Sequence, residues 1–297
     1  MKRIMRYIKI KSMSATKNRN KRALTAEETL KILDQGWYTA DDKTITIEES
    51  VDYSVDNTKL IRPNGFNEIL ESANTKLDNL DFDTSIEVKN CTVLEALSQL
   101  TQINTSVGCL NFASAKNPGG GFLGGAQAQE ESLSRASALY LSLLKHFEMY
   151  EYNRSQNTFL YSDYMIYSPE VLIFRDDNDT LLANPYKVSF VTSPAVNAGA
   201  MKQNNISELD LVEQTMFQRI DKVLAVFVAN GIENLVLGAW GCGVFQNEPK
   251  DIAQYFARYL TENGKYSKAF KNILFAVLDR NAAQENIAAF EKVFNVK

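Results

Sequence analysis

Along residues 85–297, short apolar runs alternate with longer stretches in which apolar residues recur every three or four positions. The short runs predict strands and the longer stretches predict amphipathic helices. Alternating strands and helices are typical of α/β proteins, so we predict a three-layer α/β/α sandwich with a mixed central sheet. The strands are predicted at 86–88, 107–112, 164–167, 171–174, 187–191, 235–237 and 273–277, and the helices at 93–100, 127–147, 207–229, 251–262 and 282–294.

The segment before this alternation has a weaker pattern. Thr25 and Glu28 form a capping box, and Gly36 ends the apolar stripe that follows, which predicts one helix over 24–35. A short strand is predicted at 45–47, and residues 50–85 are predicted as loop with one helix at 66–73. We therefore divide the chain into a tail (1–22), an N-terminal accessory segment with a helical extension (23–84), and a main domain (85–297).

The charge is distributed unevenly. Nine of the 32 Lys and Arg residues lie in residues 1–22, which contain no Asp or Glu. We predict a disordered, solvated tail there, although such a composition also suits an organelle-targeting peptide or a polybasic arm. The remaining chain has more acidic than basic residues, which argues against a broad basic surface and against direct nucleic-acid binding.

The composition narrows the possible chemistry. No run reaches the roughly 18 consecutive apolar residues of a membrane span, so we expect no membrane partner. The three Cys residues are too far apart in sequence for a disulfide framework or a metal cluster, which favours a reducing compartment, the cytoplasm or the nucleus. A single His makes histidine-based triads and metal sites improbable, so catalysis must use carboxylates. Coiled-coil heptads are absent, and we expect a monomer.

Three loops follow predicted strands, at the edge where open α/β sheets bind ligands. The first contains Gly119, Gly120 and Gly121, and the second contains Thr192 and Ser193. The third is rich in glycine and comprises Gly241, Cys242, Gly243, Val244 and Phe245. Glycine-rich turns after strands expose backbone amides to phosphate. Neither a Walker A nor a dinucleotide motif is present, which favours a diphosphate that is bound but not cleaved.

The sequence resembles the bacterial-type poly(ADP-ribose) glycohydrolases, which are macrodomain proteins. Their signature is a glycine triplet, a spacer of six to eight residues and Gln-Glu-Glu. Here Gly119 to Gly121 is followed by seven residues and then by Gln129, Glu130 and Glu131. The flanking residues 111–118, the Thr-Ser-Pro-Ala at 192–195 and the Gly-Cys-Gly-Val-Phe at 241–245 also match, and the resemblance extends over about residues 20–297.

The resemblance implies a macrodomain-like fold and a glycosidase that releases ADP-ribose from poly(ADP-ribose), at chain ends, without metal or cofactor. It assigns Glu131 as the catalytic acid. Cleavage of a ribosyl O-glycosidic bond requires a proton on the leaving oxygen, and the same group can then activate water. Glu130 and Glu131 are adjacent, so on a helix their side chains point about 100° apart and cannot act as two facing carboxylates.

The same resemblance assigns roles to the other residues. It implies that the glycine triplet and the 241–245 loop hold the diphosphate, that Glu130 binds ribose hydroxyls, and that Asn117 contacts the distal ribose. Phe245 would pack against that ribose, and Gln129 would orient its loop. Thr192 and Ser193 complete the predicted substrate-binding set.

Several alternatives remain open from the sequence. Acidic residues at the start of a helix also complement the helix dipole, without any catalytic role. A macrodomain can bind ADP-ribose without cleaving it, and a related enzyme could instead remove mono-ADP-ribosyl groups from protein or nucleic acid. Trp240 is expected in the core, and a redox role for Cys242 is disfavoured because the residue lies between glycines in an apolar setting.

Overall fold

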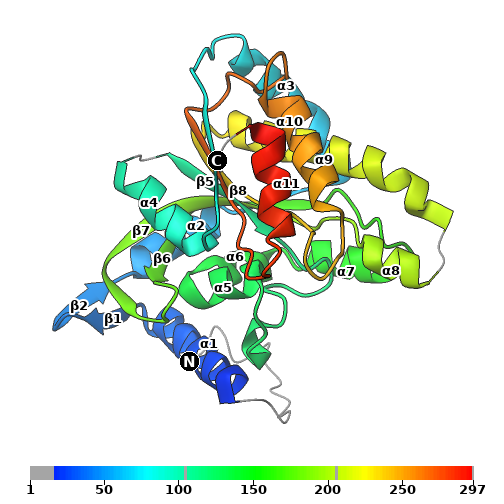
Figure 1. Cartoon of the computed structure of the whole chain (residues 1–297). Coiled ribbons are helices and arrows are strands. Elements are labelled where there is room, and N and C mark those ends of the chain that lie inside the picture. The colour runs from blue at the N-terminus through cyan, green and yellow to red at the C-terminus, as the bar shows by residue number, and fades with distance from the viewer. Residues whose placement is uncertain (1–16, 104–105, 205–206, 296–297) are drawn as a thin grey trace.

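The computed structural model describes residues 17–103, 106–204 and 207–295. A seven-stranded sheet forms the centre of the molecule (Figure 1), with strand order β3-β6-β7-β5-β8-β9-β4. A separate hairpin, β1-β2, lies at one side. The strands are β1 (Trp37–Ala40), β2 (Lys43–Thr46), β3 (Lys59–Ile61), β4 (Ser85–Lys89), β5 (Val107–Phe112), β6 (Met165–Arg175), β7 (Leu181–Ser193), β8 (Asn234–Leu237) and β9 (Asn272–Ala276).

The sheet is mixed. Strands β7, β5, β8, β9 and β4 run parallel, whereas β3 and β6 pair antiparallel at the other edge. The carboxyl ends of β5, β7 and β8 consequently meet at one edge of the sheet. The predicted strands at 164–167 and 171–174 are one strand, β6, with a register shift between Ser168 and Val171 that divides the pattern.

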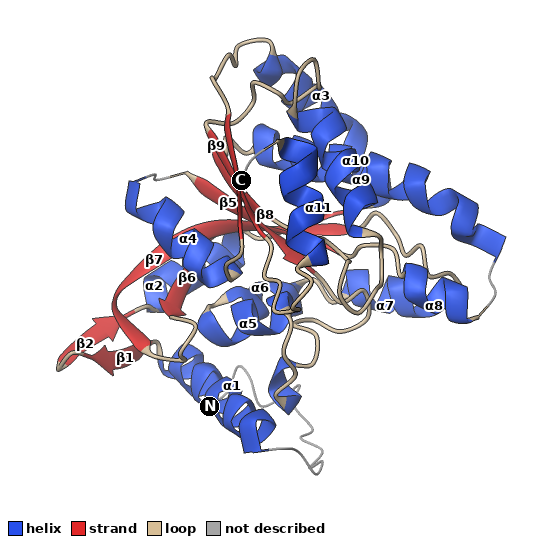
Figure 2. Cartoon of the chain, viewed as in Figure 1, coloured by secondary structure: helices blue, strands red, loops and turns tan. Residues whose placement is uncertain are grey.

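Helices cover both faces of the sheet (Figure 2). One face carries α3, α9, α10 and α11, and the other carries α2, α4, α5 and α6. No helix of the described residues is both long and apolar enough to cross a membrane. The helices are α1 (Lys17–Gln35), α2 (Glu48–Asn57), α3 (Phe66–Leu77), α4 (Val93–Ile103), α5 (Gln129–Ala136), α6 (Leu139–Lys145), α7 (Glu148–Ser155), α8 (Ala198–Gln203), α9 (Val212–Ala229), α10 (Pro249–Leu260) and α11 (Glu285–Phe294), with 3-10 turns η1 (Pro63–Gly65), η2 (Phe122–Gly124) and η3 (Ser207–Leu211).

The hydrophobic core lies on both faces of the sheet, and side chains of the central strand β5 alternate between the two faces. Val107 and Cys109 point into the cluster beneath α4, and Leu110 points into the cluster beneath α9. Each face of β5 is therefore apolar, as a strand covered on both sides requires. This arrangement confirms the predicted α/β/α sandwich with a mixed sheet and an N-terminal helical extension.

The N-terminal region departs from the predictions. The disordered tail is wrong for residues 17–22, which form the start of α1, while residues 1–16 lie outside the described residues. The predicted loop over 50–85 contains α2 and β3, and β3 is an edge strand of the main sheet. The accessory segment thus contributes to the same sheet as residues 85–297, and the division at residue 85 stays a prediction.

The long helix predicted at 127–147 is wrong as a single element, because it is divided into α5 and α6, and α7 begins only at Glu148. The break after α5 comes from contacts that the local pattern does not contain. Ser137 is extended and bridges Ile173 of β6, and the Ala138 amide donates to the Leu172 carbonyl at 3.0 Å. The backbone groups of Ser137 and Ala138 thus pair with strand β6 instead of with a further turn of helix α5.

A glycine on β5 tests the packing between the sheet and α9. A methyl group at Gly108 would lie 2.7 Å from Phe227 and 2.8 Å from Ile232. Gly108→Ala should therefore lower the free energy of unfolding by about 1–3 kcal/mol, measured by urea denaturation. Gly65→Ala is the matched control, because nothing lies within 4 Å of its added methyl. Equal stability of the two variants would contradict this packing.

Candidate active site

The predicted Gln-Glu-Glu segment begins a helix at the carboxyl edge of the sheet. Gln129, Glu130 and Glu131 form the first turn of α5, and the glycine triplet lies directly in front of it. The N–H groups at the start of a helix carry partial positive charge, which favours negative groups nearby. The structure therefore brings both predicted carboxylates to the mouth of the first loop.

Glu131 is held by the glycine triplet. The Gly121 amide donates to Glu131 Oε1 at 2.9 Å, and the second carboxylate oxygen has no partner among the described residues. Gly120 makes this approach possible because it has a φ of +59°, and a Cβ there would lie 2.3 Å from Glu131 Oε1. A side chain at position 120 would thus displace the carboxylate. Glu131 is half-buried, so its second oxygen can meet a ligand.

Glu130 has a different environment although it is adjacent. Its side chain is 3% exposed and accepts from the Ser114 amide at 2.7 Å and from Asn111 Nδ2 at 3.3 Å. Burial raises the pKa of Glu130 to about 8, and the nearby charge of Glu131 adds to that rise. Glu130 ties the loop after β5 to α5, and its predicted contact with ribose hydroxyls stays a prediction.

Gln129 fixes the start of α5 to the central strand. Its Oε1 accepts from the Phe112 amide and its Nε2 donates to the Leu110 carbonyl, both at 2.8 Å. The pairing of β5 with β8 ends at Cys109, so the side-chain amide supplies a donor and an acceptor where strand pairing has stopped. This geometry agrees with the predicted orienting role of Gln129.

The third loop exposes consecutive backbone amides. Gly243 and Val244 are exposed and Phe245 is half-buried. The amides of these three residues have no hydrogen-bond partner in the described part of the chain. By contrast, the Gly120 amide donates to the Asn117 carbonyl, and the Gly121 amide donates to Glu131. The 241–245 loop thus has unpaired amides that could bind an anion, whereas the amides of Gly120 and Gly121 are already paired.

Thr192 and Ser193, predicted to lie in the second loop, are the last two residues of β7 and lie behind the site. Thr192 and Ser193 are fully buried. The Thr192 hydroxyl accepts from Asn111 Nδ2 at 3.2 Å, and the Ser193 carbonyl accepts from the Trp240 indole at 3.2 Å. Thr192 thus supports the amide that contacts Glu130. Trp240 is fully buried, which confirms its predicted place in the core.

Cys242 lies in the third loop with a half-buried thiol. Burial raises its pKa, and Glu248 and Asp251 raise it further. The reactive thiolate is therefore disfavoured, in keeping with the sequence-based expectation against a redox role.

Asn117 is exposed, and its Oδ1 accepts from Arg154 Nη2 at 3.2 Å. Arg154 also lies over the Phe147 ring, with its guanidinium carbon 5.0 Å from the ring centre. The loop preceding the glycine triplet is thus held by α7. The predicted contact of Asn117 with the distal ribose stays a prediction.

An aromatic pair borders the third loop. Phe245 packs against Tyr161, with ring centres 5.8 Å apart. Tyr161 has a φ of +57°, a conformation that residues with a Cβ adopt rarely and that surrounding contacts must hold. The position of Tyr161 beside Phe245 makes it a candidate site residue.

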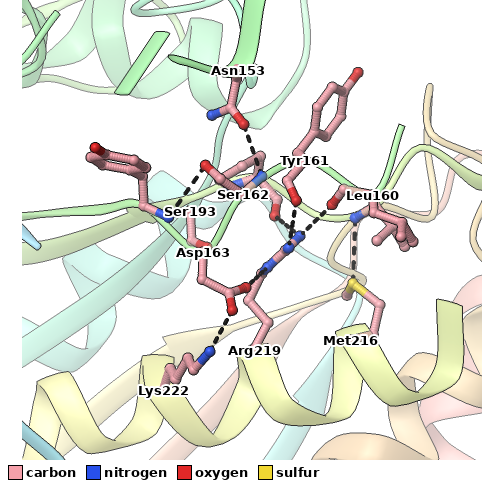
Figure 3. A network of polar contacts seen from close by, with 12 residues as sticks. Asn153, Leu160, Tyr161, Ser162, Asp163, Ser193, Met216, Arg219 and Lys222 are labelled. Atoms are coloured by element: carbon pink, nitrogen blue, oxygen red, sulfur yellow. Dashed lines mark hydrogen bonds and ion pairs between the residues drawn. The ribbon is translucent and has the colours of Figure 1, made fainter. Parts of the chain in front are cut away.

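A buried arginine holds the segment that carries Tyr161 (Figure 3). Arg219 of α9 donates to the Leu160 and Pro194 carbonyls at 3.0 Å and to the Tyr161 carbonyl at 3.3 Å. Its Nε donates to Asp163 at 2.8 Å, and Lys222 also pairs with Asp163. Burial alone would raise the pKa of Asp163, but the two cations lower it.

Among the described residues, no group of three or more His, Cys, Asp or Glu side chains could hold a metal ion. The chemistry available at this site is that of two carboxylates, backbone amides and an aromatic pair. One carboxylate is buried, and the other is accessible and oriented by a backbone amide. In such a site the accessible carboxyl group could transfer a proton to the leaving oxygen of a substrate, while the backbone amides bind an anionic part of the same substrate.

Comparison with known proteins agrees with this arrangement. Residues 26–176 match the family model described as the microbial-type PARG catalytic domain. The chain belongs to this family of poly(ADP-ribose) glycohydrolases. It is a glycosidase family, and the signature segment from the triplet to Glu131 lies within the matched residues.

Solved structures of family members resemble most of the chain. The poly(ADP-ribose) glycohydrolase of Thermomonospora curvata is 42% identical with a TM-score of 0.86, covering 93% of this chain and 100% of that one. The same enzyme bound to the inhibitor ADP-HPD is 41% identical with a TM-score of 0.84, covering 92% and 99%. The Deinococcus radiodurans glycohydrolase in complex with ADP-ribose is 41% identical with a TM-score of 0.78, covering 82% and 96%. No curated protein matches the chain.

Two buried residues that hold the loops of the candidate site were not predicted from the sequence. Arg219 falls on the apolar stripe of its helix, three residues after Met216 and four before Val223, so a charge at that position was a usable signal. Asn247 donates to the Val196 and Gly241 carbonyls and thereby joins the second and third loops. Only its position after the glycine-rich loop hinted at this role.

The raised pKa of Glu130 predicts a pH dependence of stability. In the unfolded chain this carboxyl has its ordinary pKa near 4.5, whereas in the folded protein the pKa is about 8. The folded state therefore binds the additional proton, and its stability declines as pH rises from about 5 to 8, by at most about 1.4 kcal/mol per pH unit.

Urea denaturation of wild type and Glu130→Gln at several pH values checks this expectation. The variant should gain stability relative to wild type as pH increases, because its side chain does not ionise. Other titrating groups cancel in the difference. A constant difference between the two proteins from pH 5 to pH 8 would contradict the proposed environment of Glu130.

Proposed function

We propose that this chain releases ADP-ribose from the ends of poly(ADP-ribose) by hydrolysing ribose–ribose O-glycosidic bonds, with Glu131 as the general acid and base. The observation that carries the proposal is the contact between the Gly121 amide and Glu131 Oε1. It fixes one oxygen of an accessible carboxyl group and leaves the other oxygen to face a substrate. Family membership supports the reaction class.

Glu131 acts first as an acid. Breaking the bond at the anomeric carbon develops positive charge on the ribose ring, and the leaving oxygen takes up negative charge. Transfer of the Glu131 proton to that oxygen neutralises it as the bond breaks. The resulting carboxylate then removes a proton from the attacking water, which restores the acid. Bond cleavage and water addition thus use one carboxyl group.

Glu130 has a supporting role and does not transfer the proton. It is 3% exposed, and burial raises its pKa, so it cannot serve as a second carboxylate facing the first across the substrate. Its bonds to the Ser114 amide and Asn111 hold the loop after β5 against α5. Because so little of Glu130 is exposed, it could contact ribose hydroxyls only through the small accessible part of its side chain.

The diphosphate would bind to the third loop. The unpaired amides of Gly243, Val244 and Phe245 can donate to phosphate oxygens without any Lys or Arg. The relatives bound to ADP-ribose and to ADP-HPD support a ligand of this class. The Phe245 ring, backed by Tyr161, would then pack against the distal ribose and fix the scissile bond relative to Glu131.

The main test is the release of free ADP-ribose from purified poly(ADP-ribose) in the presence of EDTA. Glu131→Gln should lower kcat at least about 100-fold because the amide cannot transfer a proton. Its affinity for ADP-ribose, measured by calorimetry, should remain near that of wild type. Glu71→Gln, an exposed substitution on α3, is the matched control and should retain full activity.

Two outcomes would overturn the proposal. If a folded wild type binds ADP-ribose but releases none, the chain is a binding module. If it cleaves mono-ADP-ribosylated protein but not the polymer, the substrate assignment is wrong. Activity retained by Glu131→Gln would refute the role of this residue alone.

A second variant tests the aromatic pair. Phe245→Ala should lower kcat/KM about tenfold, because the distal ribose loses the surface that orients the scissile bond. Trp37→Ala, an exposed aromatic substitution on β1, serves as the control for loss of a large ring. Steady-state assays on the polymer measure both. Equal kcat/KM values for Phe245→Ala and wild type would remove Phe245 from the site.

A further inference from the structure

Three arginines bind consecutive carbonyls in the spacer between the glycine triplet and Gln129. Arg19 Nε donates to Gly124 O, Arg22 Nε donates to Gly125 O, and Arg135 Nη1 donates to Ala126 O, each at 2.8 Å. We name Arg19, Arg22 and Arg135 the arginine clamp. Two of its members come from the N-terminal basic segment, about 100 residues away in sequence from the loop that they hold.

The clamped carbonyls belong to a turn that begins at Gly121. The amides of Gly124 and Ala126 donate to the Gly121 carbonyl at 3.0 and 3.1 Å, so the turn closes on that residue. The Gly121 amide, on the other side of the same residue, holds Glu131. The position of the Glu131 carboxylate therefore depends on a turn whose outer carbonyls are bound by arginines.

The N-terminal half of helix α1 packs against this turn. A Cβ at Gly125, which has a φ of +70°, would lie 2.0 Å from the Arg19 carbonyl oxygen. Further along α1, Ala26 packs with Phe122 of the turn in a small apolar cluster, and the Thr29 hydroxyl donates to the Arg135 carbonyl at 2.6 Å. These contacts fix both the turn and the end of α5.

Two of the positive charges in the arginine clamp lie close together. Arg22 and Arg135 lie near enough for the positive charge of Arg22 to oppose that of Arg135. Two cations are brought together only if their surroundings stabilise both. Here the Gly125 and Ala126 carbonyls accept from the two arginines, and the negative charges of Asp179 and Glu131 favour the Arg135 cation. A solvated tail would not place them in this way.

We infer that the first turns of α1, through Arg22 and secondarily Arg19, form a brace that positions Glu131 for catalysis. Arg22 is thus a positioning residue: it contacts the turn and does not contact the reacting atoms. The inference rests on the proposed role of Glu131, and its test includes a measurement that does not depend on activity.

The activity test compares Arg22→Ala with Lys21→Ala, which removes the same charge from the neighbouring position on the exposed side of α1. Arg22→Ala should lower kcat on poly(ADP-ribose) about tenfold with little change in KM, because the acid is misplaced while the binding amides remain. Lys21→Ala should retain wild-type kcat. Arg22→Lys should recover part of the loss, since an ammonium group can also donate to the Gly125 carbonyl.

The structural test measures hydrogen exchange of peptides covering residues 119–128. Arg22→Ala should increase exchange in this turn relative to Lys21→Ala, at a temperature below the unfolding transition of both variants. Unchanged exchange together with unchanged kcat would overturn the brace, and so would a raised KM with kcat unchanged. The two hypotheses can also fail separately. If wild type has no hydrolase activity but Arg22→Ala still shows increased exchange in the turn, the brace is supported and the proposed function is refuted.

Discussion

The hydrogen bond between the Gly121 amide and the Glu131 carboxylate is the contact on which the rest of the site depends. It requires a residue without a Cβ at position 120, a turn that points the Gly121 amide outward, and a helix that begins at Gln129. Gln129 supplies the last condition by bonding to the central strand β5. The fold thus positions the Glu131 carboxylate through backbone geometry more than through side-chain pairing.

This constraint explains how adjacent carboxylates acquire different properties. Glu130 points into the protein, where burial raises its pKa and backbone and amide donors hold it. Glu131 points toward the loop mouth and keeps one oxygen unpaired among the described residues. The unpaired amides of Gly243, Val244 and Phe245 would let an acidic chain bind an anionic ligand, because oriented peptide amides supply local positive potential that residue counts do not record.

The sheet and the Gln-Glu-Glu segment at the start of α5 could be predicted from the sequence because both are encoded locally. The strand at 107–112 matches β5 at both ends, since its apolar run is bounded by polar loops. The break at Ser137 was not predictable, because it is caused by pairing with Ile173 on a distant strand. The basic residues Lys17 to Arg22 suggested a solvated tail, because the carbonyls that Arg19 and Arg22 bind belong to a loop far along the chain. Arg219 left a local signal, a charge on an apolar helical stripe, but not the identity of its partners.

The most direct test of the account is a crystal structure of this chain with ADP-ribose bound. The account predicts that the free oxygen of Glu131 lies about 3 Å from the anomeric hydroxyl of the distal ribose. Glu131 Oε1 should remain bonded to the Gly121 amide, and the diphosphate should contact the amides of Gly243 to Phe245. A distal ribose bound out of reach of Glu131, or a diphosphate held elsewhere, would contradict it.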